Sequence, residues 1–169
     1  LAEEGVLFEH AFAQIAVTGP SHTTLFSGAG TWTHNTLLNG IPAPEDRPLL
    51  AEALLESGYH TAAFVSAYVL EDAIGLSRGF QIYDDDFSTL RGGSELLAMR
   101  LLALIRRHFS PDEVLERRGG DTTDLALSWL SQVPQDEAWM LWVHLFDPHG
   151  PYEAPGRRID GPTDGPALD

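Results

Sequence analysis

The sequence of 169 residues contains no cysteine and no lysine. The missing cysteines exclude a disulfide framework and a thiolate metal site, and they leave the redox compartment unreadable. All 10 basic residues are arginines, against 25 acidic residues, which gives a net charge of −15. This charge argues against non-specific nucleic-acid binding, so we predict no nucleic-acid partner. It still permits an anionic substrate where a metal ion or a helix N-terminus reverses the local sign.

Long hydrophobic runs are absent too. No stretch is long and apolar enough to cross a membrane, so we predict no transmembrane segment in this chain. The hydrophobic fraction of 43% is still enough for a substantial core, and the length suits one domain or a large part of one. Residues 1–5 are typical of the last turn of a helix, and a start in mid-helix indicates an internal piece of a longer protein.

Helical and strand patterns alternate along the chain, which predicts an α/β fold. The unit at residues 48–67 is typical, because an apolar-faced helix ends at Gly58 and a strand pattern follows it. Residues 138–145 form a near-continuous apolar run, which is typical of a strand buried on both faces. Further elements are expected as strands over 6–13 and 79–83, helices over 94–109 and 123–132, a solvated acidic turn at 84–86, and a loop or frayed tail over 151–169.

Residues 17–28 are dense in hydroxyl groups and predict a loop that turns into a helix over 21–27. Pro20 suits this start, since its φ is restricted and its nitrogen carries no hydrogen. Thr18 is then expected just ahead of a helix N-terminus, where free N–H groups and the helix dipole favour an anion. From the residues alone two interpretations stay open: Thr18 is a plain N-cap, or it is a nucleophile beside an anion site.

A second stretch, residues 143–152, runs from the predicted buried strand into a Pro-rich loop. Ligand sites gather at the C-terminal ends of strands in parallel α/β sheets. His144 and His149 lie there, and an imidazole can hold an anion or protonate a leaving oxygen. The alternative is that His144 is a core histidine and His149 an exposed loop residue. His34, in a polar loop, is a weaker candidate on its own.

Taken in order, these stretches resemble a segment of the sulfatase family, in the alkaline phosphatase superfamily. Thr18-Gly19-Pro20-Ser21-His22 is similar to the family's motif of Cys or Ser, any residue, then Pro-Ser-Arg, which a short helix and a His follow. Residues 148–152 resemble the family's Pro-His-x-Pro-Tyr, and residues 49–61 resemble its Leu-Ala-x-x-Leu helix with Gly-Tyr-x-Thr. The resemblance covers almost the whole chain, and the order and spacing of the motifs make it specific.

The resemblance implies an alkaline-phosphatase-like doubly wound, mostly parallel sheet with helices on both faces, of which residues 1–169 form a partial catalytic domain. It implies a parent enzyme that hydrolyses a sulfuric or phosphoric ester of a small molecule or glycan. It also implies a divalent metal ion (Ca²⁺, Mg²⁺, Mn²⁺ or Zn²⁺), held by paired Asp residues on an N-terminal strand and by a late Asp with Asn or His. These N-terminal and C-terminal ligand segments are not in the sequence, so we expect the fragment alone to be inactive.

The resemblance also assigns roles residue by residue. Thr18 falls on the nucleophile position, where its oxygen is also a metal ligand. Formylglycine is not expected, because Thr cannot be converted to it and His22 replaces the Arg that assists this residue. His34 falls on a catalytic His near the nucleophile, and His149 on a position that contacts the transferred or leaving group. His22 and His144 complete the expected substrate-binding set.

Two alternatives to hydrolysis stay open. A nucleophilic Thr is also found in relatives that transfer phosphoethanolamine, so the enzyme could pass its Thr-bound group to an acceptor other than water. The chain could equally be an inactive truncated homologue that keeps the fold and has lost the metal site. Metal analysis and an assay of the parent protein separate these alternatives.

Overall fold

The centre of the computed structural model is a parallel three-stranded sheet, and the structure describes residues 3–87, 117–147, 149, 153–154 and 157–158. The strand order is β2-β1-β3. The pairing aligns Phe64 with Asp84 on one side and Val65 with His144 on the other. The three strands are β1 (His60–Val65), β2 (Ile82–Asp84) and β3 (Trp139–His144).

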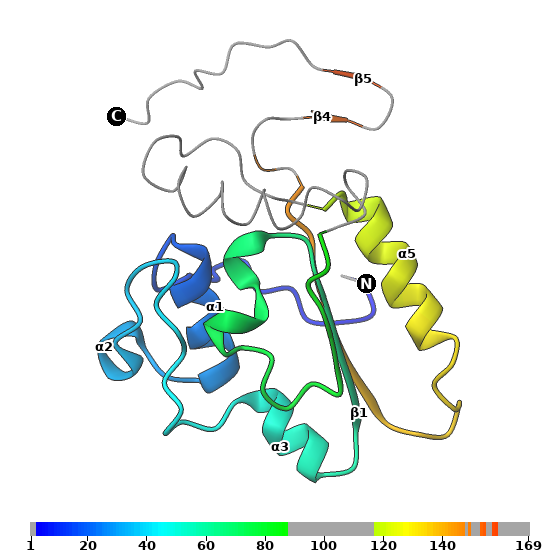
Figure 1. Ribbon diagram of the computed structural model, residues 1–169, viewed down its shortest axis with the longest axis horizontal. Helices are drawn as coiled ribbons and strands as arrows, with labels where there is room; N and C mark the ends of the chain where they lie inside the picture. The colour runs from blue at the N-terminus through cyan, green and yellow to red at the C-terminus, as the bar shows by residue number, and fades with distance from the viewer. Residues whose placement is uncertain (1–2, 88–116, 148, 150–152, 155–156, 159–169) are drawn as a thin grey trace.

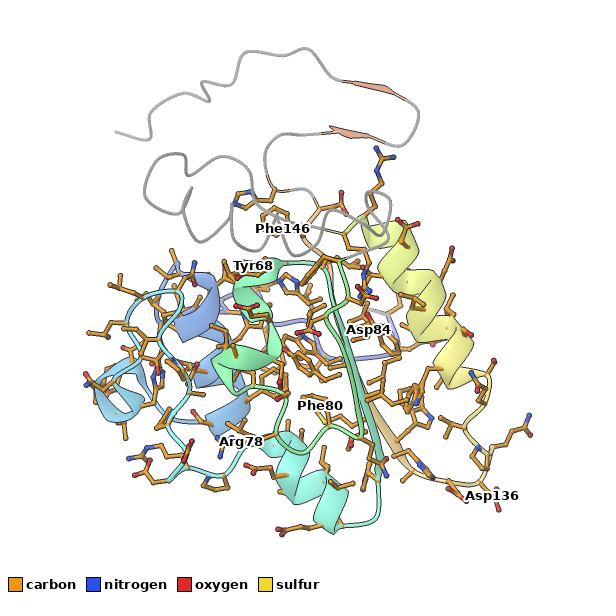
Figure 2. The ribbon with its side chains drawn as sticks, in the orientation of Figure 1. Tyr68, Arg78, Phe80, Asp84, Asp136 and Phe146 are labelled. Atoms are coloured by element: carbon orange, nitrogen blue, oxygen red, sulfur yellow. The ribbon has the colours of Figure 1, made fainter. Side chains whose placement is uncertain are left out.

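Helices cover both faces of this sheet, which confirms the predicted α/β fold (Figure 1). Helices α1 and α3 pack on one face, and α5 packs on the other. The strands begin near Asp136 and end near Phe146 (Figure 2). None of the described helices is long and apolar enough to cross a membrane. The remaining elements are α1 (Thr18–Ser27), α2 (Thr31–His34), α3 (Leu50–Glu56), η1 (Tyr68–Leu70), η2 (Asp72–Ile74), α5 (Gly119–Leu130), and the antiparallel pair β4 (Glu153–Ala154) and β5 (Arg157–Arg158).

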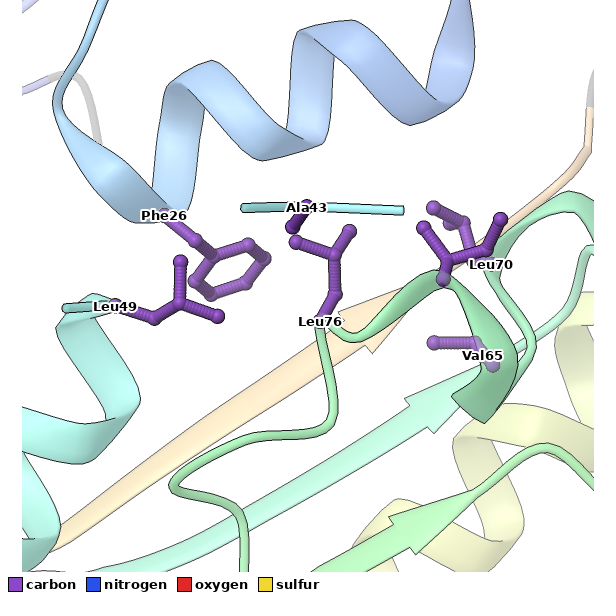
Figure 3. Packing of buried hydrophobic residues seen from close by; sticks show 7 residues of the cluster. Phe26, Ala43, Leu49, Val65, Leu70 and Leu76 are labelled. Atoms are coloured by element: carbon purple, nitrogen blue, oxygen red, sulfur yellow. The ribbon is translucent and has the colours of Figure 1, made fainter. Parts of the chain in front are cut away.

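Side chains of β1 alternate between two cores, one on each face of the sheet. Ala62 and Phe64 contact Ala126 of α5 on one face. Val65 contributes to the larger core on the other face, beneath α1. Figure 3 shows that core, which contains Phe26, Ala43, Leu49, Val65, Leu70, Ile74 and Leu76. Phe26 is the residue of α1 in this core, and its burial holds the C-terminal end of the helix against the sheet.

Trp142 of β3 connects α1 to the sheet. Its ring centroid lies 4.6 Å from that of Phe26, in an edge-on arrangement. The rings of Phe80 and Tyr83 lie 6.0 and 6.2 Å from it. The edge-to-face pair of Phe26 and Trp142 adds stabilisation beyond the area that it buries. Phe26 of α1 and Trp142 of β3 are thus in direct contact.

A buried arginine ties together the C-terminal ends of the strands. Arg117 is only 2% exposed and forms an ion pair with the carboxylate of Asp84. Its guanidinium also donates to the carbonyl oxygen of Val65 and to Oγ1 of Thr122, both at 3.0 Å. The backbone N–H of Arg117 donates to the Ser66 carbonyl oxygen at 2.8 Å. One side chain therefore joins β1, β2 and α5.

Several sequence predictions are wrong in detail. Residues 6–13 are not a strand; Phe8 and Phe12 are 75% and 88% exposed, because no described strand lies beside them. Residues 3–5 form a turn and a bend rather than a helix. Strand β3 is at the edge of the described sheet and is only partly buried, whereas β1 is the buried strand. The helix expected over 94–109 lies outside the described residues.

Helix boundaries and surface assignments also need correction. Helix α1 begins at Thr18 rather than at residue 21. Helix α5 begins at Gly119, ahead of the start expected at residue 123. Asp84 ends β2 and binds Arg117, so residues 84–86 are not simply a solvated turn. The expected tail contains the β4–β5 pair.

Replacing Gly79 by Ala should destabilise the fold by about 3 kcal/mol. Gly79 has a φ of 84°, and an added Cβ would lie 2.1 Å from the Glu52 nitrogen, in backbone that cannot move aside cheaply. Gly58 is the matched control, because its φ is 85° and nothing lies within 4 Å of an added Cβ. Gly58→Ala should cost only about 1 kcal/mol. Urea unfolding measures both losses, and equal values would contradict the packing argument.

Replacing Asp84 by Ala should lower the free energy of unfolding by about 3 kcal/mol, because it leaves the Arg117 charge buried without its ion-pair partner. The control is Asp136→Ala, which removes an exposed carboxylate and should change stability by less than about 0.5 kcal/mol. Thermal and urea unfolding of the two variants test this. A small loss in both would show that the ion pair contributes little.

Candidate active site

An open cavity of about 340 Å³ lies where the N-terminus of α1 meets the C-terminal end of β3. Its polar lining residues are Thr18, Ser21, His22, His144 and His149, and its other walls are apolar. Phe146, part of that wall, lies at the end of the molecule where β3 terminates (Figure 2). The structure therefore brings together four of the five site residues that the sequence predicts.

Helix α1 supplies three of these polar groups from one face. Thr18, Ser21 and His22 are spaced i, i+3 and i+4, which places their side chains over one another on a helix. Thr18 is the first residue inside α1, and Val17 takes the cap position without a side-chain cap. The N-cap interpretation of Thr18 is therefore wrong. Ser21 was missed because the helix was expected to begin only at residue 21, although the spacing itself was visible.

Most of the N–H groups that we expected to form an anion site at this helix start are already engaged or absent. The Gly19 N–H donates to Oδ1 of Asn39 at 2.7 Å. Pro20 has no N–H, and the Ser21 N–H donates to the Val17 carbonyl oxygen at 2.9 Å. Three of the first four helical residues thus offer no free donor to a ligand. The imidazoles, and not a row of amides, are the main polar groups facing the cavity.

His22 is held in one orientation and one tautomer. Its Nδ1 lies 2.7 Å from the Thr18 carbonyl oxygen, which can only accept, so Nδ1 carries the proton. Nε2 is then the unprotonated nitrogen. Burial lowers the pKa of His22, and the hydrogen bond to Thr18 offsets this only in part. His22 is therefore neutral at neutral pH and has an acceptor nitrogen on the face of α1 that carries Thr18.

His144 packs against His22, with ring centroids 5.1 Å apart in an edge-on arrangement. Burial, followed by the nearby His22, lowers the pKa of His144 to about 4. Its Nδ1 is buried and has no hydrogen-bond partner among the described residues. A buried imidazole nitrogen without a partner is uncommon and marks a place where a ligand group or water can bind. His144 thus combines the two earlier interpretations: it is core-packed, and it faces the site.

His149 is placed at the cavity by the turn that follows β3. Its ring stacks on Phe146 with centroids 4.3 Å apart, and its N–H donates to the Phe146 carbonyl oxygen at 2.9 Å. The side chain is exposed to solvent while it lines the cavity. His149 is therefore held at the edge of the site, within reach of both solvent and a bound molecule.

His34 lies elsewhere, beside the middle of α1. Its Nδ1 accepts from the Thr36 N–H at 3.0 Å, so Nε2 carries the proton and donates to Oγ1 of Thr24 at 2.9 Å. It is only 4% exposed, and burial, with a smaller contribution from Arg47, lowers its pKa. Both ring nitrogens are engaged and the residue does not line the cavity. Its catalytic role stays a prediction.

A metal site does not emerge from these residues alone. Within the described ranges there is no group of three or more His, Asp or Glu side chains arranged to hold a metal ion. Asp147, the carboxylate nearest in sequence to His144 and His149, accepts the Gly119 N–H at 2.7 Å. The described residues therefore do not fit a complete divalent-metal site.

Acid should weaken the fold through His144. The pKa of His144 is about 6.5 in the unfolded chain and about 4 in the folded chain. The unfolded chain therefore takes up a proton first as the pH falls. The contribution of neutral His144 to the free energy of unfolding is full above pH 6.5 and is lost between pH 6.5 and pH 4. Because solvent partly screens the ring, this loss is about 2 kcal/mol. Urea unfolding at neutral pH and at about pH 4.5 measures the loss. A His144→Gln variant should lose less, and an equal loss in both proteins would contradict the assignment.

Residues 1–162 match the sulfatase family. Among solved structures, the fold is similar to that of BT4656 in complex with its substrate D-glucosamine-2-N,6-O-disulfate, at 16% identity and a TM-score of 0.58. It is also similar to the phosphonate monoester hydrolase of Agrobacterium radiobacter, at 21% identity and a TM-score of 0.58.

The two likenesses cover 85% and 93% of this chain, which spans 27% and 37% of those two proteins. They confirm the alkaline-phosphatase-like fold. No curated protein matches the sequence. Because the family match extends over nearly all of the sequence and the fold agrees with it, the chain belongs to the sulfatase family.

Proposed function

We propose that this chain is the nucleophile-bearing part of a sulfatase-like hydrolase that cleaves a sulfate or phosphate ester through Thr18. The observation that carries the proposal is the shared cavity. Thr18 and His22 reach it from α1, while His144 and His149 reach it from β3 and the turn after it. Two segments far apart in the sequence thus bring two hydroxyls and three imidazoles together, a combination suited to nucleophilic and acid–base chemistry.

The side chains have separate tasks in this proposal. The Thr18 oxygen attacks sulfur or phosphorus, and the unprotonated Nε2 of His22 accepts the hydroxyl proton. The bond to the ester oxygen breaks, and His149 supplies a proton to that leaving oxygen. Water then attacks the covalent Thr18 ester and regenerates the hydroxyl. The partnerless Nδ1 of His144 is available to an oxygen of the transferred group or to the attacking water.

The parent protein is also proposed to use a divalent metal ion, Ca²⁺, Mg²⁺, Mn²⁺ or Zn²⁺, and not formylglycine. Thr18 would provide one oxygen ligand, and the other ligands would come from beyond the described residues. The substrate is proposed to be a small-molecule or glycan ester. The disulfated glucosamine bound by the similar protein BT4656 supports that class.

Thr18→Ala in the full-length protein should reduce kcat/KM at least about 1,000-fold on an aryl sulfate or an aryl phosphate diester, assayed side by side. Thr18→Ser keeps a hydroxyl and should retain part of the activity. Thr33→Ala is the control, because it removes an exposed hydroxyl outside the cavity. Unchanged turnover of Thr18→Ala on both substrates would rule out Thr18 as nucleophile.

The same assay separates the remaining alternatives. The hydrolase releases the sulfate or phosphate group into water, with transient labelling of Thr18. A phosphoethanolamine-type transferase would pass the group to an added alcohol acceptor in preference to water. An inactive homologue would neither turn over these substrates nor bind a divalent ion in stoichiometric amount.

A further inference from the structure

We infer that Asn39 is a positioning residue for Thr18, acting from a turn that lies against the start of α1. The inference rests on the proposed function of Thr18. Asn39 accepts the Gly19 N–H at 2.7 Å through its side-chain oxygen. Val17, at the cap position, has no side chain able to do so. Asn39 therefore performs the capping of α1 from a position distant in sequence.

The contact acts on the peptide group that Thr18 shares with its neighbour. Atoms of one peptide bond lie in a plane, so the Thr18 carbonyl and the Gly19 N–H turn together. His22 holds the carbonyl end at 2.7 Å, and Asn39 holds the N–H end at 2.7 Å. The plane is thus fixed from both sides. Its orientation sets the direction in which the Thr18 side chain leaves the backbone.

Gly19 has little freedom to move away from this arrangement. It is buried, so its N–H would be costly to leave without an acceptor. A Cβ added to it would lie 3.2 Å from Oδ1 of Asn39 and 3.7 Å from its Cα, which shows how closely the two residues pack. The Gly19 carbonyl oxygen also accepts from Oγ1 of Thr23 at 2.9 Å. Both polar groups of residue 19 are therefore engaged.

Asn39 is itself held in place by a tight turn. The Ile41 N–H donates to the Leu38 carbonyl oxygen at 3.3 Å, and Gly40 has a φ of 83°, as the third residue of a type II turn requires. Just after the turn, the Ala43 N–H donates to the Ile74 carbonyl oxygen at 2.8 Å and anchors the loop to η2. The acceptor is therefore preorganised before substrate binds.

A purely structural cap would affect stability but not the chemical step, and this difference defines the test. Asn39→Leu keeps the approximate shape and removes the acceptor. Asn39→Asp keeps an acceptor oxygen but adds a negative charge near the site. Ser27→Ala is the control at the other end of α1. It removes a hydroxyl that donates to the Thr23 carbonyl oxygen at 2.6 Å and accepts the Ala29 N–H at 3.2 Å.

In the full-length protein, Asn39→Leu should speed hydrogen exchange of the Gly19 amide about tenfold. It should also lower kcat at least about tenfold with KM nearly unchanged, well below the unfolding temperature, because the attacking oxygen is misplaced. Asn39→Asp should restore the Gly19 protection and kcat and raise KM, since its charge repels an anionic ester. Ser27→Ala should leave Gly19 exchange and both kinetic constants at wild-type values.

Two results would overturn the inference. One is a wild-type exchange rate of the Gly19 amide in Asn39→Leu, which would mean that the contact does not restrain the peptide. The other is faster exchange with wild-type kcat, which would reduce Asn39 to a stabilising cap. The exchange measurement needs no turnover. It therefore tests whether Asn39 restrains the Gly19 amide, even if the Thr18→Ala assay has already rejected the proposed function.

Discussion

The ion pair between Arg117 and Asp84 is the interaction on which the functional end of the sheet depends. A guanidinium removed from water must be neutralised and fully hydrogen-bonded, and here its partners come from β1, β2 and α5. These elements are thereby fixed where the strands end. Strand β3, which carries His144, pairs with β1 up to Val65, one of the Arg117 acceptors. The position of the cavity therefore depends on the buried charge of Arg117, although Arg117 does not line the cavity.

The electrostatic character of the cavity follows from which groups are already occupied. The first amides of α1 donate to Asn39 and to Val17, and no arginine lies among the lining residues. His22 and His144 are desolvated together and lie close to each other, so protonating either is unfavourable. The site therefore contains two neutral imidazoles, those of His22 and His144, and the hydroxyls of Thr18 and Ser21. This environment suits proton transfer better than static attraction of an anion.

Local pattern was enough to predict β1, β3 and α3, because apolar runs indicate the two strands and a helical repeat of apolar residues indicates α3. The resemblance to sulfatases, together with the strand-end position of His144, was enough to predict a set of site residues, of which Thr18, His22, His144 and His149 line one cavity and His34 does not. Neither could predict the contacts of Arg117 or Asn39, since each depends on residues distant in sequence that only the folded chain brings near. The same reason applies to His34, whose motif position gives no information on the two hydrogen bonds that hold it against α1.

The edge-on contact of Phe26 with Trp142 has a mechanical consequence. Phe26 lies one helical turn beyond His22 on α1, and Trp142 precedes His144 by two residues on the same face of β3. The contact between the two rings therefore links the helix that carries Thr18 to the strand that carries His144. Because both elements line the cavity, the packing of Phe26 against Trp142 helps to set the distance between them there.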